Sequence, residues 1–264
     1  MRLYVAVASL LLSGPALALD TVREIQTCVQ GNIPVNAVRQ DLALNHLNRS
    51  GKSRQMIGRL FLERSDKDLL KLVRKLQQPK ALFNAAYLFL QGTGYLPDKL
   101  LGIYDDRVHM YLPATRKPRE IKSSAVGSEL FGTNLNTADI KHLFGSLSGS
   151  RVKLDGQGKH QGRSAYRVNV TPYEQSSPYS RVDVLIDAAT CLAGHTSFYA
   201  ANGQLEKTLI QDLNKVTKVD GRFVGHHYTM QDAHSAEKTE LILGNVHYDK
   251  DLPDTLFHPD GFYR

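Results

Sequence analysis

The sequence predicts a mainly β protein of the α+β class: a strongly curved antiparallel sheet or incomplete barrel with a few packed helices. Three observations indicate this class. About a dozen segments alternate apolar and polar residues with a period of two, at intervals of about 8–14 residues. Helical spacing of apolar residues occurs only near the start, the middle and the end. No Pro-, Ser- or Gly-rich linker divides the chain, which favours a single domain over residues 19–264.

The chain opens on a signal-peptide pattern. Arg2 supplies a positive charge, Leu3–Leu12 form an apolar run, and Ala16-Leu17-Ala18 is a small-x-small cleavage signal. A run of about ten residues is too short to span a bilayer, which requires about 20. We therefore expect residues 1–18 to be a signal peptide cleaved after Ala18; an N-terminal core helix is the alternative.

The first element of the mature chain is a predicted helix. Val22, Ile25 and Val29 follow helical spacing, and Asp20 is a plausible N-cap. Pro34 lies just beyond its end.

The period then changes to two, which predicts a meander of strands. Lys67–Lys75 also fits a helix, but we favour a strand there because hairpin-spaced strands flank it. The expected strands of this half are 38–46, 55–63, 70–75, 81–91, 100–104 and 107–112.

Asn136–Phe144 begins with N-cap candidates and predicts a short helix in the middle of the chain. The strand pattern returns after Ser150, with Gly156-Gln157-Gly158 among the turn signals. Leu252–Phe257 predicts a short helix or turn. The expected strands of this half are 151–155, 164–171, 181–186, 194–200, 205–214, 223–232 and 238–247.

Export changes the interpretation of the two cysteines, Cys28 and Cys191. In an oxidising compartment two cysteines most simply form one disulfide. Two buried free thiols are the alternative. Without clustered histidines, two cysteines do not make a structural zinc site.

A curved sheet has a concave face, and an apolar concave face is a natural site for an apolar ligand. Alternating apolar residues of the predicted strands are the candidate cavity lining; for each of them, packing in the core is the alternative. The candidates are Leu42, Leu44, Met56, Leu60, Leu62, Leu70, Leu72, Leu88, Leu90, Met110, Leu112 and Phe131.

A basic cluster follows in Arg116, Lys117, Arg119 and Lys122. It predicts a contact surface for anionic headgroups or a membrane partner; a solvated edge that blocks strand pairing is the alternative. The formal net charge of +7 also favours acidic partners. An export signal argues against nucleic acid as that partner.

Composition and motifs exclude several classes of protein. With 42% hydrophobic and 22% charged residues, the chain is neither disordered nor a polytopic membrane protein. It lacks GxSxG, HExxH, P-loop and strand-to-helix GxGxxG motifs. His226 and His227 are adjacent and would point to opposite faces of a regular strand, so they do not share a metal. We expect no enzyme activity, no cofactor and no metal.

Three stretches carry a resemblance to a known family. They are Gly94–Ile103 (GYLPDKLLGI), Val108–Pro113 (VHMYLP) and Ser128–Ile140 (SELFGTNLNTADI), and Leu252–Phe257 (LPDTLF) adds a closing segment. In this order and spacing they resemble the outer-membrane lipoprotein-sorting, or LolA-like, proteins. The resemblance extends from about Cys28 to Phe257.

The resemblance implies a half-open β-barrel with helices against its concave face, and residence in the periplasm. It implies a carrier that binds lipid or lipoprotein acyl chains and transfers them between membranes, as a monomer. The alternative is a non-carrying accessory protein that docks on an inner-membrane exporter of the resistance-nodulation-division (RND) type.

Overall fold

The computed structural model describes most of the chain after the predicted signal peptide. The described residues are 19–34, 36–64, 83–91, 97–104, 107–112, 116–121, 127, 129–130, 132–143, 150–173, 177–249, 252–257 and 260–261.

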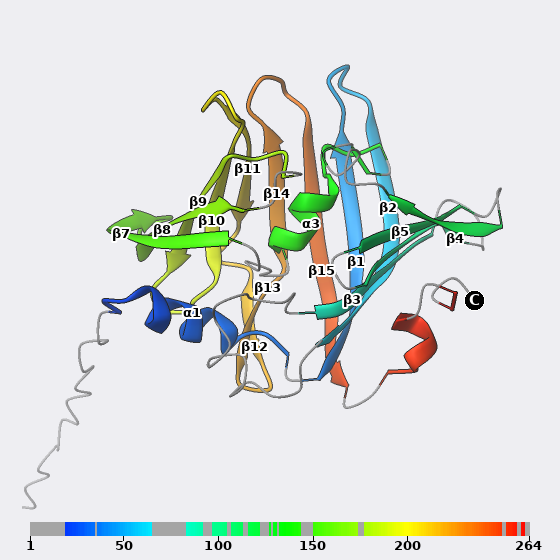
Figure 1. Cartoon of the computed structure of the whole chain (residues 1–264), viewed down its shortest axis with the longest axis horizontal. Coiled ribbons are helices and arrows are strands. Elements are labelled where there is room, and N and C mark those ends of the chain that lie inside the picture. Colours follow the sequence, from blue (N-terminus) through cyan, green and yellow to red (C-terminus); the bar gives the residue numbers. More distant parts are fainter. Residues whose placement is uncertain are drawn as a thin grey trace, which may run out of the picture.

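Two antiparallel meanders form the sheet (Figure 1). The first contains β1 (Ala37–Leu47), β2 (Ser53–Arg64), β3 (Phe83–Gln91), β4 (Pro97–Tyr104), β5 (Arg107–Leu112) and β6 (Lys117–Ile121). The second contains β7 (Ser150–His160), β8 (Arg163–Pro172), β9 (Arg181–Asp187), β10 (Ala193–Tyr199), β11 (Leu205–Gln211), β14 (His227–Asp232) and β15 (Lys238–Asp249). A separate hairpin, β12 (Val216–Val219) and β13 (Arg222–Gly225), is inserted between β11 and β14.

The two meanders join through β1 and β15, which pair over most of their length. The hydrogen-bonded order of the 13 described strands of this sheet therefore runs from β6 at one end to β7 at the other. Those two end strands are neighbours in sequence. The connection from β6 to β7 therefore leads from one end of the sheet to the other, and this crossing segment contains a helix at residues 137–143.

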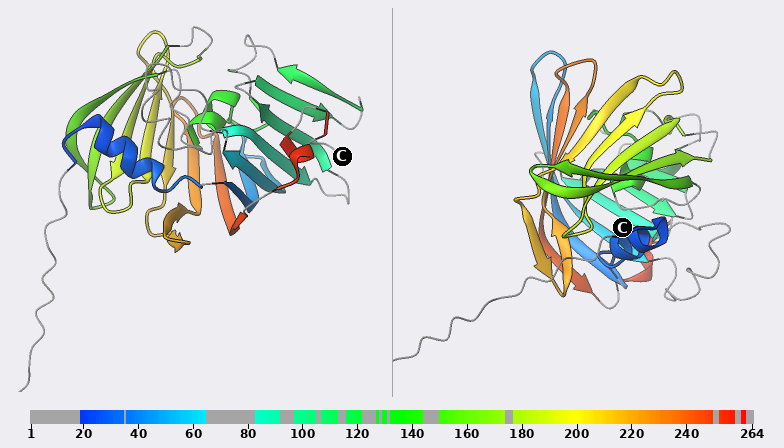
Figure 2. Two further views of the ribbon diagram at one scale, coloured as in Figure 1. Left: turned by 60° about the horizontal axis from the view of Figure 1, so that its bottom comes forward. Right: turned by 90° about the vertical axis from the view of Figure 1, so that its left-hand side faces the viewer.

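The helices lie on the inner side of the curved sheet (Figure 2). Helix α1 (Val22–Gln30) covers the ends of the second meander, and α3 (Thr137–Leu143) belongs to the crossing segment. The 3₁₀ helix η2 (Asp254–Phe257) contacts β3. The expected class is confirmed: a curved antiparallel sheet with helices against its concave face, in which the described strands leave the barrel unclosed.

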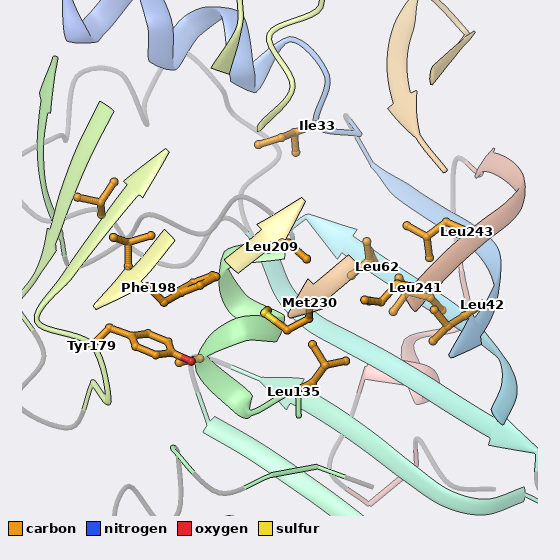
Figure 3. Close-up of a cluster of buried hydrophobic side chains, with 14 of the residues drawn as sticks. Ile33, Leu42, Leu62, Leu135, Tyr179, Phe198, Leu209, Met230, Leu241 and Leu243 are labelled. Carbon is orange, nitrogen blue, oxygen red and sulfur yellow. The ribbon is translucent and has the colours of Figure 1, made fainter. Parts of the chain in front are cut away.

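The core lies between the concave face and α3 (Figure 3). In β1 the buried and half-buried residues alternate, so that Leu42 and Leu44 both point inward. Leu44 pairs with Met56 on β2 and with Leu241 on β15, which continues the apolar row across three strands. Full burial of such a side chain stabilises the fold by about 1.5–3 kcal/mol.

The predicted start of α1 needs one correction. The N-cap is Thr21 instead of Asp20: its side chain accepts from the Glu24 amide, while Glu24 Oε2 accepts from the Thr21 amide. This reciprocal capping box satisfies two free amides at once, which Asp20 does not do here.

Two predicted segments differ in the second half. Gly156-Gln157-Gly158 is not a turn but lies inside β7, where Gly156 has φ 101° and the register with β8 shifts. A glycine in this conformation accommodates the extra residue of a β-bulge. The predicted strand 223–232 divides at His226, because β13 leaves the main sheet to pair with β12.

Strand β6 is not among the strands predicted from the sequence. Its Lys117-Pro118-Arg119 stretch predicts only a basic surface, yet Pro118 pairs with Tyr111 on β5. Proline lacks a backbone N–H, and the outer side of an end strand does not need one. The predicted signal peptide and the predicted strand 70–75 fall outside the described residues.

Candidate ligand-binding site

A disulfide holds the cover of the second meander in place. Cys28 on α1 is bonded to Cys191, in the turn between β9 and β10, with their Cα atoms 5.6 Å apart. The predicted pairing of these cysteines is therefore confirmed. The two cysteines are 163 positions apart in sequence, and their bond joins the first helix to the turn between two strands of the second meander.

The segment after α1 is fixed by hydrogen bonds on two sides. Asn32 Nδ2 donates to the Thr190 carbonyl over 2.7 Å, and Asn32 Oδ1 accepts from the Phe223 amide over 2.9 Å. Arg222 Nε donates to the Ile33 carbonyl over 3.3 Å. This cover therefore bridges the disulfide turn and the β12–β13 hairpin.

Helix α3 is fixed by a buried polar cluster around Asp139, which is fully buried. Its Oδ2 accepts from Lys207 Nζ and from the Asn136 amide, at 2.9 and 2.8 Å. Its Oδ1 accepts from the Tyr179 hydroxyl at 2.6 Å. Burial and the neighbouring Asp139 charge raise the pKa of Tyr179, which keeps its phenol protonated as a donor.

A cavity of about 220 Å³ lies under this cover. Its cover consists of Val29, Asn32, Ile33 and Pro34 after α1, His142 and Leu143 of α3, Cys191, Leu192 and Ala193 near the disulfide, and Phe223, Val224 and Gly225 of the hairpin. Its floor consists of Val38, Gln40, Leu62, Val168, Val170, Val184, Ile186, Thr196, Leu209, Gln211, Tyr228, Leu243 and Tyr248. Figure 3 shows Ile33, Leu62, Leu209 and Leu243 among the buried side chains.

The chemistry of this cavity is that of an apolar binding site. Among the described residues that line it, none carries a carboxylate, an ammonium or a guanidinium group. Hydrocarbon gains about 0.8 kcal/mol per CH₂ on entering such a space from water. The volume lies below the roughly 300–1,000 Å³ of sites for drug-sized ligands, so it suits a single slender chain.

The predicted lining residues fall into three groups. Leu62 lines the cavity. Leu42, Leu44, Met56 and Leu60 are buried in the same core cluster as Leu62. The side chains of Leu70, Leu72, Leu88, Leu90, Met110, Leu112 and Phe131 lie outside the described part of the structure, although Leu88, Leu90, Met110 and Leu112 are on strands β3 and β5.

Most residues of the cavity floor come from the second meander, and none of them was predicted from the sequence as lining. The available signal was the same alternation that identified the first meander: Val168 with Val170, and Val184 with Ile186, share one face of β8 and β9. The predicted disulfide also indicated that α1 would cover these strands.

The predicted basic cluster lies at an end strand. Arg116, Lys117 and Arg119 are exposed, the last two on β6, while Lys122 is outside the described residues. The cluster is at the first-meander end of the sheet, and the cavity is beneath the second-meander cover.

The described residues contain neither a metal-ligand cluster nor a helix suited to span a membrane. No three His, Cys, Asp or Glu side chains gather closely enough there to hold a metal ion. None of the helices there has both the length and the apolar character needed to cross a membrane.

A family model described as "Uncharacterized protein" matches residues 90–264, more than half of the chain. The chain belongs to this family. No curated protein matches the sequence.

Solved structures share the fold. A putative outer membrane lipoprotein-sorting protein domain from Vibrio parahaemolyticus superposes with a TM-score of 0.70 at 16% identity, covering 89% of this chain and 95% of that one. A DUF1329 family protein from Desulfovibrio piger gives 0.71 at 20% identity, with coverage of 91% and 98%. A LolA superfamily protein from Nitrosomonas europaea gives 0.69 at 14% identity, also with 91% and 98%. The resemblance seen in the sequence is thus confirmed as a LolA-like fold.

Proposed function

We propose that this protein is a periplasmic carrier that binds an acyl chain of a lipid or lipoprotein and transfers it between membranes. The observation that carries the proposal is the apolar cavity beneath the α1 and α3 cover. Its uncharged wall favours hydrocarbon over any ionic ligand. The fold shared with a putative lipoprotein-sorting protein supports the same class of cargo.

A substitution at Val184 tests this proposal. Val184 is a half-buried residue on β9 that lines the cavity. Val184→Glu places a carboxylate where a chain would lie, and burying it without a partner opposes binding. We expect affinity for a neutral fluorescent amphiphile to fall at least about tenfold while the protein still melts cooperatively. Probe titration and circular dichroism measure the two effects.

The matched control is Ile57→Glu on β2, because Ile57 is 53% exposed and faces away from the core. It should bind as the unchanged protein does. If the unchanged protein binds no amphiphile at all, the carrier proposal is wrong. If Val184→Glu binds normally, the ligand occupies another site.

A second candidate function is docking on a membrane or on an RND-type inner-membrane exporter. The exposed positions of Lys117 and Arg119 on the end strand β6 favour it. A cationic surface there is available for an acidic partner without covering the cavity.

Lys117→Glu is the corresponding test. A basic residue close to an anionic surface contributes about 1 kcal/mol, so charge reversal should weaken binding to phosphatidylglycerol vesicles roughly tenfold or more. Lys159→Glu is the control, since Lys159 is exposed on β7 at the opposite end of the sheet. Equal losses in both variants would show a general charge effect instead of docking through β6.

A further inference from the structure

The cavity wall contains a few polar side chains, and two of them face each other across neighbouring strands. Gln211 on β11 and Tyr228 on β14 are directly opposite each other in the antiparallel register, and both line the cavity. Gln211 is 1% exposed, and its Nε2 has no hydrogen-bond partner among the described residues. Buried amide donors are nearly always paired in folded proteins, so an unpaired one indicates a missing acceptor.

A third strand packs closely on this pair. A Cβ at Gly225 on β13 would collide with both Gln211 Nε2 and the Tyr228 hydroxyl. The absence of a side chain at this position lets β13 pass beside the two polar groups while they remain at the cavity wall. Three strands therefore define the place of the donors.

The surroundings select the charge of the group that this pair can bind. Among the described residues that line the cavity there is no Lys or Arg side chain to neutralise an anion, and His142 is the one imidazole. Burial raises the pKa of Tyr228, so its hydroxyl stays protonated and can donate. An ionised carboxylate would be buried without a counter-charge, whereas a neutral carbonyl oxygen would accept from the pair without that penalty.

We propose that Gln211 and Tyr228 form a hydrogen-bonding subsite for the carbonyl oxygen of a neutral acyl ester, whose hydrocarbon chain fills the apolar part of the cavity. This inference rests on the proposed carrier function and specifies its ligand. The volume of about 220 Å³ limits the occupant to one chain of modest length.

The experiment compares ligands that share a chain and differ at its end. Methyl decanoate, decanoate and decane compete with the neutral probe N-phenyl-1-naphthylamine, and each dissociation constant is measured at pH 7. We expect methyl decanoate to bind about tenfold more tightly than decane, as one neutral hydrogen bond allows. We expect decanoate to bind more weakly than its methyl ester.

Two variants test whether Gln211 and Tyr228 cause the preference for ester over alkane. Gln211→Leu removes the donor at similar size and should abolish the difference between ester and alkane, and circular dichroism checks that the variant still melts cooperatively. Tyr228→Phe removes only the hydroxyl and should reduce the same difference by several-fold, which keeps the subsite testable if Gln211→Leu fails to fold. Gln55→Leu, at an exposed glutamine on β2, should change nothing.

The outcomes separate the two proposals. Equal affinity of the unchanged protein for ester and alkane would overturn the polar subsite and leave the carrier function standing. Failure to bind any of the three ligands or the probe would overturn both. An ester preference that survives in Gln211→Leu would overturn the role of Gln211.

Discussion

Asp139→Ala is expected to lower the free energy of unfolding by roughly 3–5 kcal/mol, the cost of leaving one member of a buried ion pair uncompensated. Asp139 is fully buried, and Lys207 beside it has a side chain that is only 13% exposed. The substitution would leave the Lys207 ammonium without its carboxylate partner and remove the acceptor of the Tyr179 hydroxyl. Urea denaturation followed by circular dichroism measures the change.

The matched control is Asp155→Ala. Asp155 also accepts from a lysine, Lys153, but these side chains are 40% and 74% exposed, so solvent screens the pair. Its loss should change stability by less than about 1 kcal/mol. A similarly small change for Asp139→Ala would show that the buried cluster does not anchor α3.

A double-mutant cycle tests whether Asp139 and Lys207 act together. When Lys207→Met is combined with Asp139→Ala, the buried ammonium without a counter-charge is removed as well, and part of the lost stability should return. Additive effects of Asp139→Ala and Lys207→Met on stability would contradict the coupling.

Because His142 and Leu143 of α3 line the cavity, Asp139→Ala should also weaken acyl binding.

The fold was largely predictable because its strands follow a strong local rule. Alternation in β1 identifies the inward positions of Leu42 and Leu44, and the structure buries both. Helix α3 was predictable from its own N-cap: Asn136 Oδ1 accepts from the Asp139 amide, which is a contact between residues three apart in sequence.

The site was less predictable because its geometry depends on long-range pairing. Alternation shows that Val170 and Leu44 each face inward, but it does not show which inward residues meet a helix and which meet a cavity. That choice is made by the β1–β15 junction and by the crossing segment from β6 to β7. The Gln211–Tyr228 pair was equally unpredictable, because no local sequence pattern places β11 beside β14 across an inserted hairpin.

The Cys28→Ser/Cys191→Ser variant is expected to lose roughly 2–5 kcal/mol of stability, because the native bond closes a long loop and constrains the unfolded chain. The 163-residue separation puts the loop near the upper end of that effect. Guanidinium unfolding of the variant, and of the unchanged protein with and without a reducing agent, measures the loss. The reduced protein should match the variant.

The same variant should also exchange ligand faster. Cys191 lines the cavity, and the bond holds α1 and the segment that follows it over the cavity. The Asn32 bonds to Thr190 and Phe223 remain in the variant, so the cover should still form but open more often. Stopped-flow release of a bound fluorescent amphiphile should therefore accelerate, while Ile57→Glu releases it at the original rate. Unchanged release from a destabilised variant would mean that the ligand does not leave past α1, and that the disulfide stabilises the fold without controlling access.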